Sequence, residues 1–147
     1  MFNRKVSTLN EVLEAAQQAL KNLIVDFENL EKKISKINEL VQSSSINKHK
    51  LYDSTNIQVY DALNKMALLL AKYDYFDTLL EKIDNKIQEK LNSLIISCDD
   101  SLSHVMSHPY FRDSSNYRKD KEKFDKLLAE CSAIKDELIP SARPGLT

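Results

Sequence analysis

The stretch that decides the fold runs from Leu9 to Val41 and reads LNEVLEAAQQALKNLIVDFENLEKKISKINELV. Its apolar residues recur at alternating steps of four and three, which is a heptad repeat without a slip. They are Leu9, Leu13, Ala16, Leu20, Leu23, Phe27, Leu30, Ile34, Ile37 and Val41. A helix with such a stripe is unstable alone in water, because the stripe must be covered by another helix. The stretch therefore predicts a helix near residues 8–42 that packs against helices of this chain or of another one.

Composition indicates long helices in the rest of the chain as well. The 147 residues include one glycine, Gly145, and three prolines, the first of which is Pro109. Because Gly and Pro interrupt regular structure most often, the elements before Pro109 are expected to be long. Aromatic residues are few and Trp is missing, so a sheet is not expected. We expect one domain over residues 1–139 and a loose C-terminal tail over 140–147.

A second helix is expected over residues 55–98, because apolar residues recur from Val59 to Leu94 with no Gly or Pro between them. At about 1.5 Å per residue this helix would be longer than the first and would overhang it. Its centre, residues 68–70, is apolar on most sides. We therefore expect it to make contacts on two sides, one of them with the first helix.

A break is expected after the second helix, at residues 98–101 (CDDS), followed by a short helix over 102–108 that Pro109 stops. A third main helix is expected over 115–139, before Pro140. The predicted fold is thus all-α: an elongated antiparallel helical bundle or coiled coil of three main helices plus a short connecting helix.

Net charge and cysteine content bear on the compartment. The formal net charge is −1, so the overall field of the protein does not favour nucleic acid or an anionic membrane. The longest apolar run, residues 66–71, is far shorter than the roughly 20 residues that span a bilayer. Two cysteines do not make the dense disulfide framework of a small secreted domain. We expect a cytoplasmic or nuclear protein without a membrane span.

One group of potential metal ligands lies near the end of the second expected helix. The group consists of Cys98, Asp99, Asp100, His104 and His108. On a helix the two histidines would share a face, and such groups could hold zinc. However, no second ligand pair has a metal-binding spacing, and Pro109 follows at once, which favours surface histidines near a helix end. The chain also lacks the Glu-x-x-His pairs of di-iron bundles, calcium loops and glycine-rich phosphate loops. No metal, cofactor or small-molecule substrate is expected.

The two cysteines do not point to an enzyme. Neither belongs to a Cys-x-x-Cys motif. Cys131 lies in the apolar seam of the third expected helix, where a thiol is most often a small core residue. The role of Cys98 stays open, because a nucleophilic thiol also needs an oriented base and none can be named. The sequence therefore predicts a non-enzymatic protein.

A mixed charged segment lies over residues 112–126. Its basic residues are Arg112, Arg118, Lys119, Lys121, Lys123 and Lys126, interleaved with the aromatic residues Tyr110, Phe111 and Tyr117. This mixture is typical of single-stranded nucleic-acid binders. Four acids, Asp113, Asp120, Glu122 and Asp125, dilute the basic charge, which favours a solvated helix start instead.

We expect a structural or adaptor subunit whose heptad seams bind other helices within a multiprotein assembly. The alternative is a small dimeric helical regulator or secretion chaperone that holds a client, and a third interpretation is nucleic-acid binding through residues 112–126. The predicted partner-binding residues lie on the overhanging end of the second helix and on the segment after it. They are Ile87, Leu91, Leu94, Ile95, Met106, Tyr110, Phe111 and Arg112. As an alternative, Tyr110 and Phe111 fold back onto the bundle as a lid.

Overall fold

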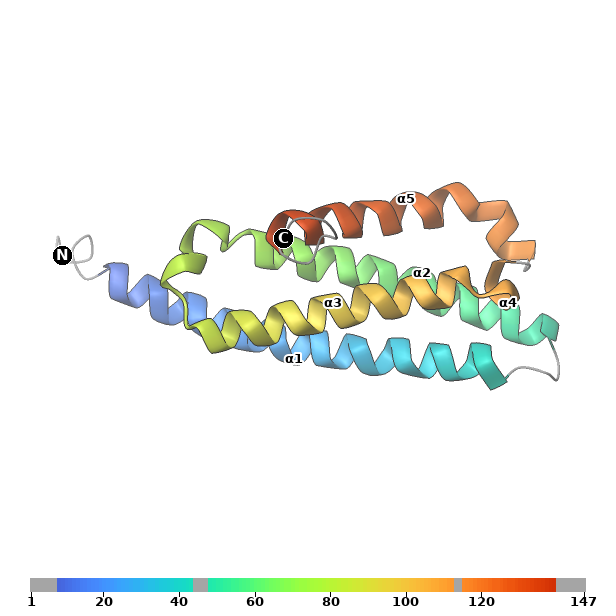
Figure 1. Ribbon diagram of the computed structural model, residues 1–147, viewed down its shortest axis with the longest axis horizontal. Coiled ribbons are helices and arrows are strands. Elements are labelled where there is room, and N and C mark those ends of the chain that lie inside the picture. Colours follow the sequence, from blue (N-terminus) through green and yellow to red (C-terminus); the bar gives the residue numbers. More distant parts are fainter. Residues whose placement is uncertain (1–7, 44–47, 113–114, 140–147) are drawn as a thin grey trace, which may run out of the picture.

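The computed structural model of the protein describes residues 8–43, 48–112 and 115–139. The helices in these ranges are α1 (Thr8–Ser43), α2 (Lys48–Asp74), the 3₁₀ helix η2 (Asp77–Lys82), α3 (Asn85–Ser107), α4 (Pro109–Arg112) and α5 (Ser115–Leu138), shown in Figure 1. These described ranges contain no strand. The all-α helical bundle predicted from the sequence is confirmed, with four long helices in place of three.

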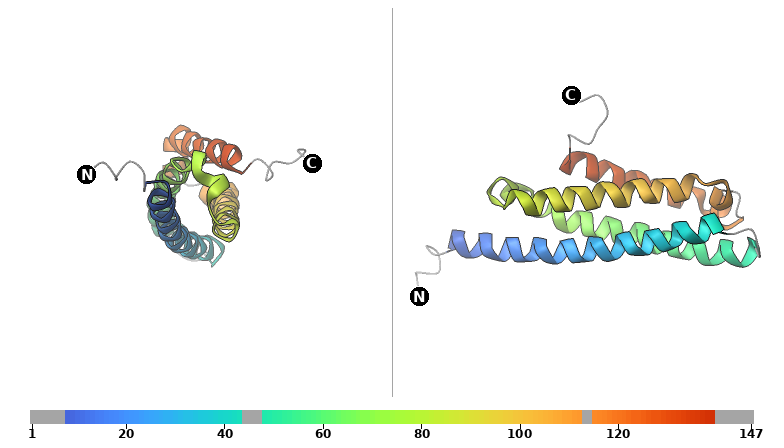
Figure 2. Two further views of the ribbon diagram at one scale, coloured as in Figure 1. Left: turned by 90° about the vertical axis from the view of Figure 1, so that its left-hand side faces the viewer. Right: turned by 60° about the horizontal axis from the view of Figure 1, so that its bottom comes forward.

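The four long helices pack around one core. α1 and α3 run in one direction, and α2 and α5 run in the opposite direction (Figure 1). The most extensive contacts join α1 to α3, α1 to α2 and α2 to α5, and α3 closes the ring against α5. Seen end-on, the order around the bundle is α1, α2, α5 and α3 (Figure 2). Consecutive helices α2 and α3 therefore lie on a diagonal, and the connection through η2 crosses the end of the bundle.

The heptad seam of α1 forms the centre of this core. Its eight residues from Ala16 to Val41 are at most 3% exposed, and Phe27 is fully buried. The seam fails only at its N-terminal end, where Leu13 is half-buried and Leu9 is 54% exposed. Because α1 contacts both α2 and α3, its apolar face has two neighbours within the chain.

The prediction of one helix over residues 55–98 is wrong. The second helix begins earlier, at Lys48, and ends at Asp74, after which the chain turns and returns as α3. The turn lets the apolar stripe that follows Ile83 pack on α1, whereas a straight helix would have carried that stripe into solvent. The overhang expected for the second helix is therefore not formed.

The turn between α2 and α3 contains no Gly or Pro and is stabilised by hydrogen bonds from polar side chains. The side chain of Asp84 accepts a hydrogen bond from the backbone N–H of Lys86, 2.9 Å away, which caps the start of α3. The side-chain amide of Gln88 donates to the carbonyl oxygens of Leu80 and Ile83, and so ties η2 to α3. Tyr73 at the end of α2 is buried, and its hydroxyl donates to Asn92 Oδ1 on α3.

The break expected at residues 98–101 is also wrong, because α3 continues through it to Ser107. Cys98 and Asp99 are buried there, so their packing favours the continuous helix. The short helix expected over 102–108 is the end of α3, and the short connecting helix is α4. Pro109 ends α3 as predicted and begins α4, where its missing N–H is not needed. α5 matches its predicted range to within one residue, with a kink at Asp120.

Candidate functional site

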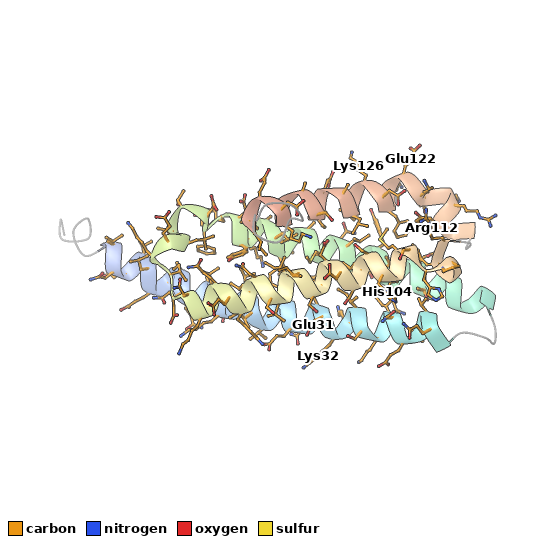
Figure 3. All side chains as sticks on the ribbon, in the orientation of Figure 1. Glu31, Lys32, His104, Arg112, Glu122 and Lys126 are labelled. Carbon is orange, nitrogen blue, oxygen red and sulfur yellow. The ribbon has the colours of Figure 1, made fainter. Side chains whose placement is uncertain are left out.

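Most side chains predicted to bind a partner lie in the core. Ile87, Leu91, Leu94, Ile95, Met106 and Phe111 are all at most 8% exposed. Arg112, the last residue of α4, is exposed (Figure 3), and the side chain of Tyr110 lies outside the described residues. The reason is the turn at η2, which removes the overhang on which that prediction rested. On the folded bundle the six buried side chains are not accessible to a partner.

Phe111 belongs to an aromatic cluster that seals one end of the bundle. Its ring centroid lies 4.9 Å from that of Tyr117 and 5.4 Å from that of Phe124. Phe124 in turn makes an edge-on contact with Tyr60 of α2 at 5.8 Å. The hydroxyl of Tyr117 donates to Asp125 Oδ1 over 2.8 Å. The lid alternative from the sequence therefore describes Phe111 correctly.

Both cysteines are buried as thiols. Burial is the main cause that raises the pKa of Cys98 and of Cys131 to about 12, and nearby carboxylates, Glu31 and Asp99 for Cys98, contribute to the same shift. The Cys98 Sγ lies 3.8 Å from the carbonyl oxygen of Phe27, and the Cys131 Sγ lies 3.7 Å from that of Leu63. Since the thiolate is the reactive form, this environment suppresses nucleophilic chemistry at neutral pH. Cys131 is a core residue as predicted, and Cys98 is one too.

A buried ionic cluster joins α3 to α5, and sequence reasoning did not find it. Asp99 is 5% exposed and accepts hydrogen bonds from Lys135 Nζ at 2.8 Å and from Ser132 Oγ at 3.2 Å. Burial lowers the pKa of Lys135, but the hydrogen bond and the charge of Asp99 outweigh it, so the net shift is upward. Ser132 and Lys135 lie three residues apart on one helical face, which was the available signal. Because its groups are paired with one another, the cluster fixes the position of α5 on α3.

The possible zinc ligands do not come together. His104 is exposed (Figure 3), His108 is half-buried, and Asp99 is engaged by Lys135. Across residues 8–43, 48–112 and 115–139, no three His, Cys, Asp or Glu side chains gather at a metal-binding distance.

Basic and acidic side chains alternate on the exposed surface of α5. Lys121 pairs with Asp125 at 3.4 Å, and Glu122 and Lys126 point away from the bundle (Figure 3). This mixture of charge does not form a continuous basic stripe, which a phosphate backbone would require.

The outer face of α2, together with Tyr75 in the turn that follows α2, carries a second row of side chains that are apolar except for Asn64. The row consists of Ile57, Tyr60, Asn64, Leu68, Ala71 and Tyr75, at steps of three and four residues, and we call it the α2 outer stripe. Ile57 is 65% exposed, Leu68 is 51% exposed and Tyr75 is 83% exposed. On the opposite face Leu69, next to Leu68, is fully buried. α2 is thus apolar on two faces, of which the core uses one.

A groove flanks each end of the α2 outer stripe. One groove, of about 510 Å³, lies between α1 and α2 and is lined by Leu68, Ala71 and Tyr75 together with Ala19 and Asp26 of α1. The other, of about 400 Å³, lies between α2 and α5; its lining includes Ile57, Tyr60, Asp61, Lys123 and Phe124. Single exposed apolar residues are common on proteins, but a row at helical spacing beside two grooves is typical of a helix-packing surface.

The apolar centre at residues 68–70 was visible in the sequence and predicted contact on two sides. The most extensive contacts of α2 are indeed with two helices, α1 and α5, and smaller ones join it to α3 and α4. Leu68 is not buried by these core contacts; it is 51% exposed and lies on the α2 outer stripe. The surface was missed because the apolar excess was attributed entirely to neighbours within the fold.

Comparisons with known proteins give no family: no family model, no curated protein and no solved structure matches this chain. The class that can be stated is the one defined by the fold, an all-α helical bundle. None of the described helices has the length and apolar character needed to cross a membrane.

Proposed function

We propose that the protein is a non-enzymatic adaptor or structural subunit that packs an amphipathic helix of another polypeptide chain against the α2 outer stripe. The observation that carries this proposal is the exposure of Ile57, Leu68 and Tyr75, each more than half exposed, in one row at helical spacing. A helix laid into a groove of a second helical protein uses the same spacing of anchors. Aromatic anchors such as Tyr75 are also the side chains that most often dominate interface energies.

The proposal differs in its surface from the one expected from the sequence. The heptad seam of α1 is covered by α2 and α3 of the same chain, so it has no free face to offer a partner. The α2 outer stripe has the same residue chemistry and remains uncovered in the chain.

The other polar and reactive groups of the bundle support a scaffold role. The two thiols have pKa values of about 12 because they are buried, and Asp99 is paired with Lys135. These groups connect helices of the bundle to one another, and none of them faces either groove of the outer stripe.

The test is capture of proteins from an extract of the source cells by three tagged forms of the chain. The first is the wild type, and the second carries Leu68→Glu and Tyr75→Glu. The matched control carries Asn29→Glu and Ser93→Glu, which add the same charge at exposed positions of α1 and α3. We expect one set of proteins to be retained by the wild type and the control and lost from the stripe variant. Retention of the same set by the stripe variant would contradict the proposal.

A further inference from the structure

We infer that the helix packed against the α2 outer stripe is α2 of a second copy of this chain, in an antiparallel pair with two-fold symmetry. This inference rests on the proposed function, which makes the stripe a contact surface. It adds the identity of the occupant and the register of the contact.

The residues of the stripe complement one another when the row is reversed. In an antiparallel pair centred near residue 66, Ile57 lies opposite Tyr75 of the other copy. Tyr60 lies opposite Ala71, and Asn64 lies opposite Leu68. A large side chain therefore faces a small one at the Tyr60–Ala71 position, which close packing of two helices requires.

Charges beside the stripe favour the antiparallel direction. Asp61 and Lys72 both line grooves on the α1 side of the stripe, Asp61 with Lys33 and Lys36 and Lys72 with Asp26. Asp61 also borders the groove between α2 and α5. A two-fold axis perpendicular to the helices brings the α1 sides of both copies together. Asp61 of each copy then faces Lys72 of the other, which forms two equivalent opposite-charge pairs.

A parallel pair does not offer this complementarity. It would place the α1 side of one copy against the α5 side of the other, and would separate Asp61 from Lys72. Within the described ranges neither residue makes an ion pair of its own, so both are available to a second copy.

The exposed end of the stripe also has a counterpart. The antiparallel register places Tyr75, 83% exposed, opposite Ile57 of the other copy, which is 65% exposed. Each copy thus supplies one tyrosine ring and one isoleucine side chain, and the two-fold axis pairs them at both ends of the contact, as an isologous interface requires.

The size of the contact sets the expected affinity. From Ile57 to Tyr75 the stripe is about 27 Å long at 1.5 Å per residue, a single helix pair rather than a broad interface. Contacts of this size lie at the small end of specific interfaces, so we expect a reversible dimer with a dissociation constant of roughly 1–100 μM.

Sedimentation equilibrium from 1 to 500 μM tests the inference on the purified chain. The wild type should pass from monomer to dimer over this range. Leu68→Ser with Tyr75→Ser should raise the dissociation constant at least about tenfold. The control Val12→Ser with Val25→Ser, at exposed positions of α1, should leave it unchanged. A wild type that stays monomeric at 500 μM, or a dimer that the stripe variant retains, would overturn the inference.

Failure of the dimer can be told apart from failure of the proposed function. If the wild type stays monomeric but still captures stripe-dependent partners from extract, the second copy is not the occupant and the adaptor proposal stands. If the wild type neither dimerises nor captures such partners, both proposals fail.

The register has its own test by cross-linking. The natural thiols are buried, so single cysteines at Asp61→Cys and Lys72→Cys report on the surface. Mixed under mild oxidation, the two variants should yield mainly the disulfide between Cys at 61 and Cys at 72. Homodisulfides of either variant as the main product would indicate a parallel pair and contradict the antiparallel register.

Charge reversal provides a second check that does not depend on oxidation. Asp61→Lys should weaken the dimer several-fold, and Asp61→Lys with Lys72→Asp should restore it to within about twofold of the wild type. No restoration by the double variant, with helicity intact, would refute the Asp61–Lys72 pairing.

Discussion

The seam of α1 and the outer stripe of α2 have the same chemistry and opposite environments. Both place apolar side chains at steps of three and four along a helix. In α1 the eight seam residues from Ala16 to Val41 are at most 3% exposed, whereas Leu68 of α2 and Tyr75, which directly follows α2, are 51% and 83% exposed. The comparison teaches that periodic apolar residues identify a packing surface but not its occupant. In α1 the occupant belongs to the same chain, and in α2 we propose that it belongs to another.

The largest expected effect comes from removing a ring of the α1 seam. Phe27→Ala should destabilise the bundle by about 3–5 kcal/mol, because it leaves a cavity beside a fully buried position. Val25→Ala, two residues away and 53% exposed, is the control and should change the free energy of unfolding by less than about 0.5 kcal/mol. Urea unfolding followed by circular dichroism measures both. Equal losses would show that the seam is not the centre of the core.

A smaller loss is expected from the ionic cluster between α3 and α5. Asp99→Ala removes hydrogen bonds from Lys135 and Ser132 and should cost about 2 kcal/mol, the range for hydrogen bonds to charged groups. Asp100→Ala, at the exposed neighbour, should be close to neutral. If α5 were held only by its contacts with α2, the two variants would unfold at the same urea concentration.

Alkaline pH should weaken the fold through the buried thiols. Folding raises the pKa of Cys98 and Cys131 from 9.0 to about 12, so above pH 9 the unfolded chain releases protons that the folded chain keeps. The free energy of unfolding should therefore fall as the pH rises, by up to about 1.4 kcal/mol per pH unit for each thiol.

Between pH 9 and 10 the free energy of unfolding should fall less steeply with pH in a Cys98→Ala, Cys131→Ala variant, because this variant has no thiols to titrate. Chemical unfolding at several pH values gives the slope of this free energy against pH for each protein, and the two slopes are compared. The same slope in both proteins would show that the thiols are ionised or accessible in the folded state.

Local patterns predicted α1 and α5 well, because the heptad repeat of α1 is continuous and because α5 was expected to end before Pro140. The turn between α2 and α3 was missed for a physical reason. Asp84 and Gln88 stabilise it through hydrogen bonds that depend on the folded geometry, and no Gly or Pro marks the position.

The candidate site was less predictable than the fold, for a related reason. Ile87 and Leu91 were assigned to a partner because a straight second helix would have exposed them, and one missed turn moves them into the core. The apolar character of Leu68 was visible in the sequence, but its direction depends on where α1 and α5 lie around α2. Such long-range placement is not encoded in the spacing along a single helix.

The adjacent leucines of α2 give the most direct test of the two-face account, because they differ in environment and not in chemistry. Leu69 is fully buried and Leu68 is 51% exposed. The measurement is the free energy of unfolding of Leu68→Ala and Leu69→Ala at about 1 μM protein, where a weak dimer would be dissociated. We expect Leu69→Ala to lose about 2–5 kcal/mol and Leu68→Ala to stay within about 0.5 kcal/mol of the wild type. A loss of several kcal/mol for Leu68→Ala would place this residue in the core and contradict the account.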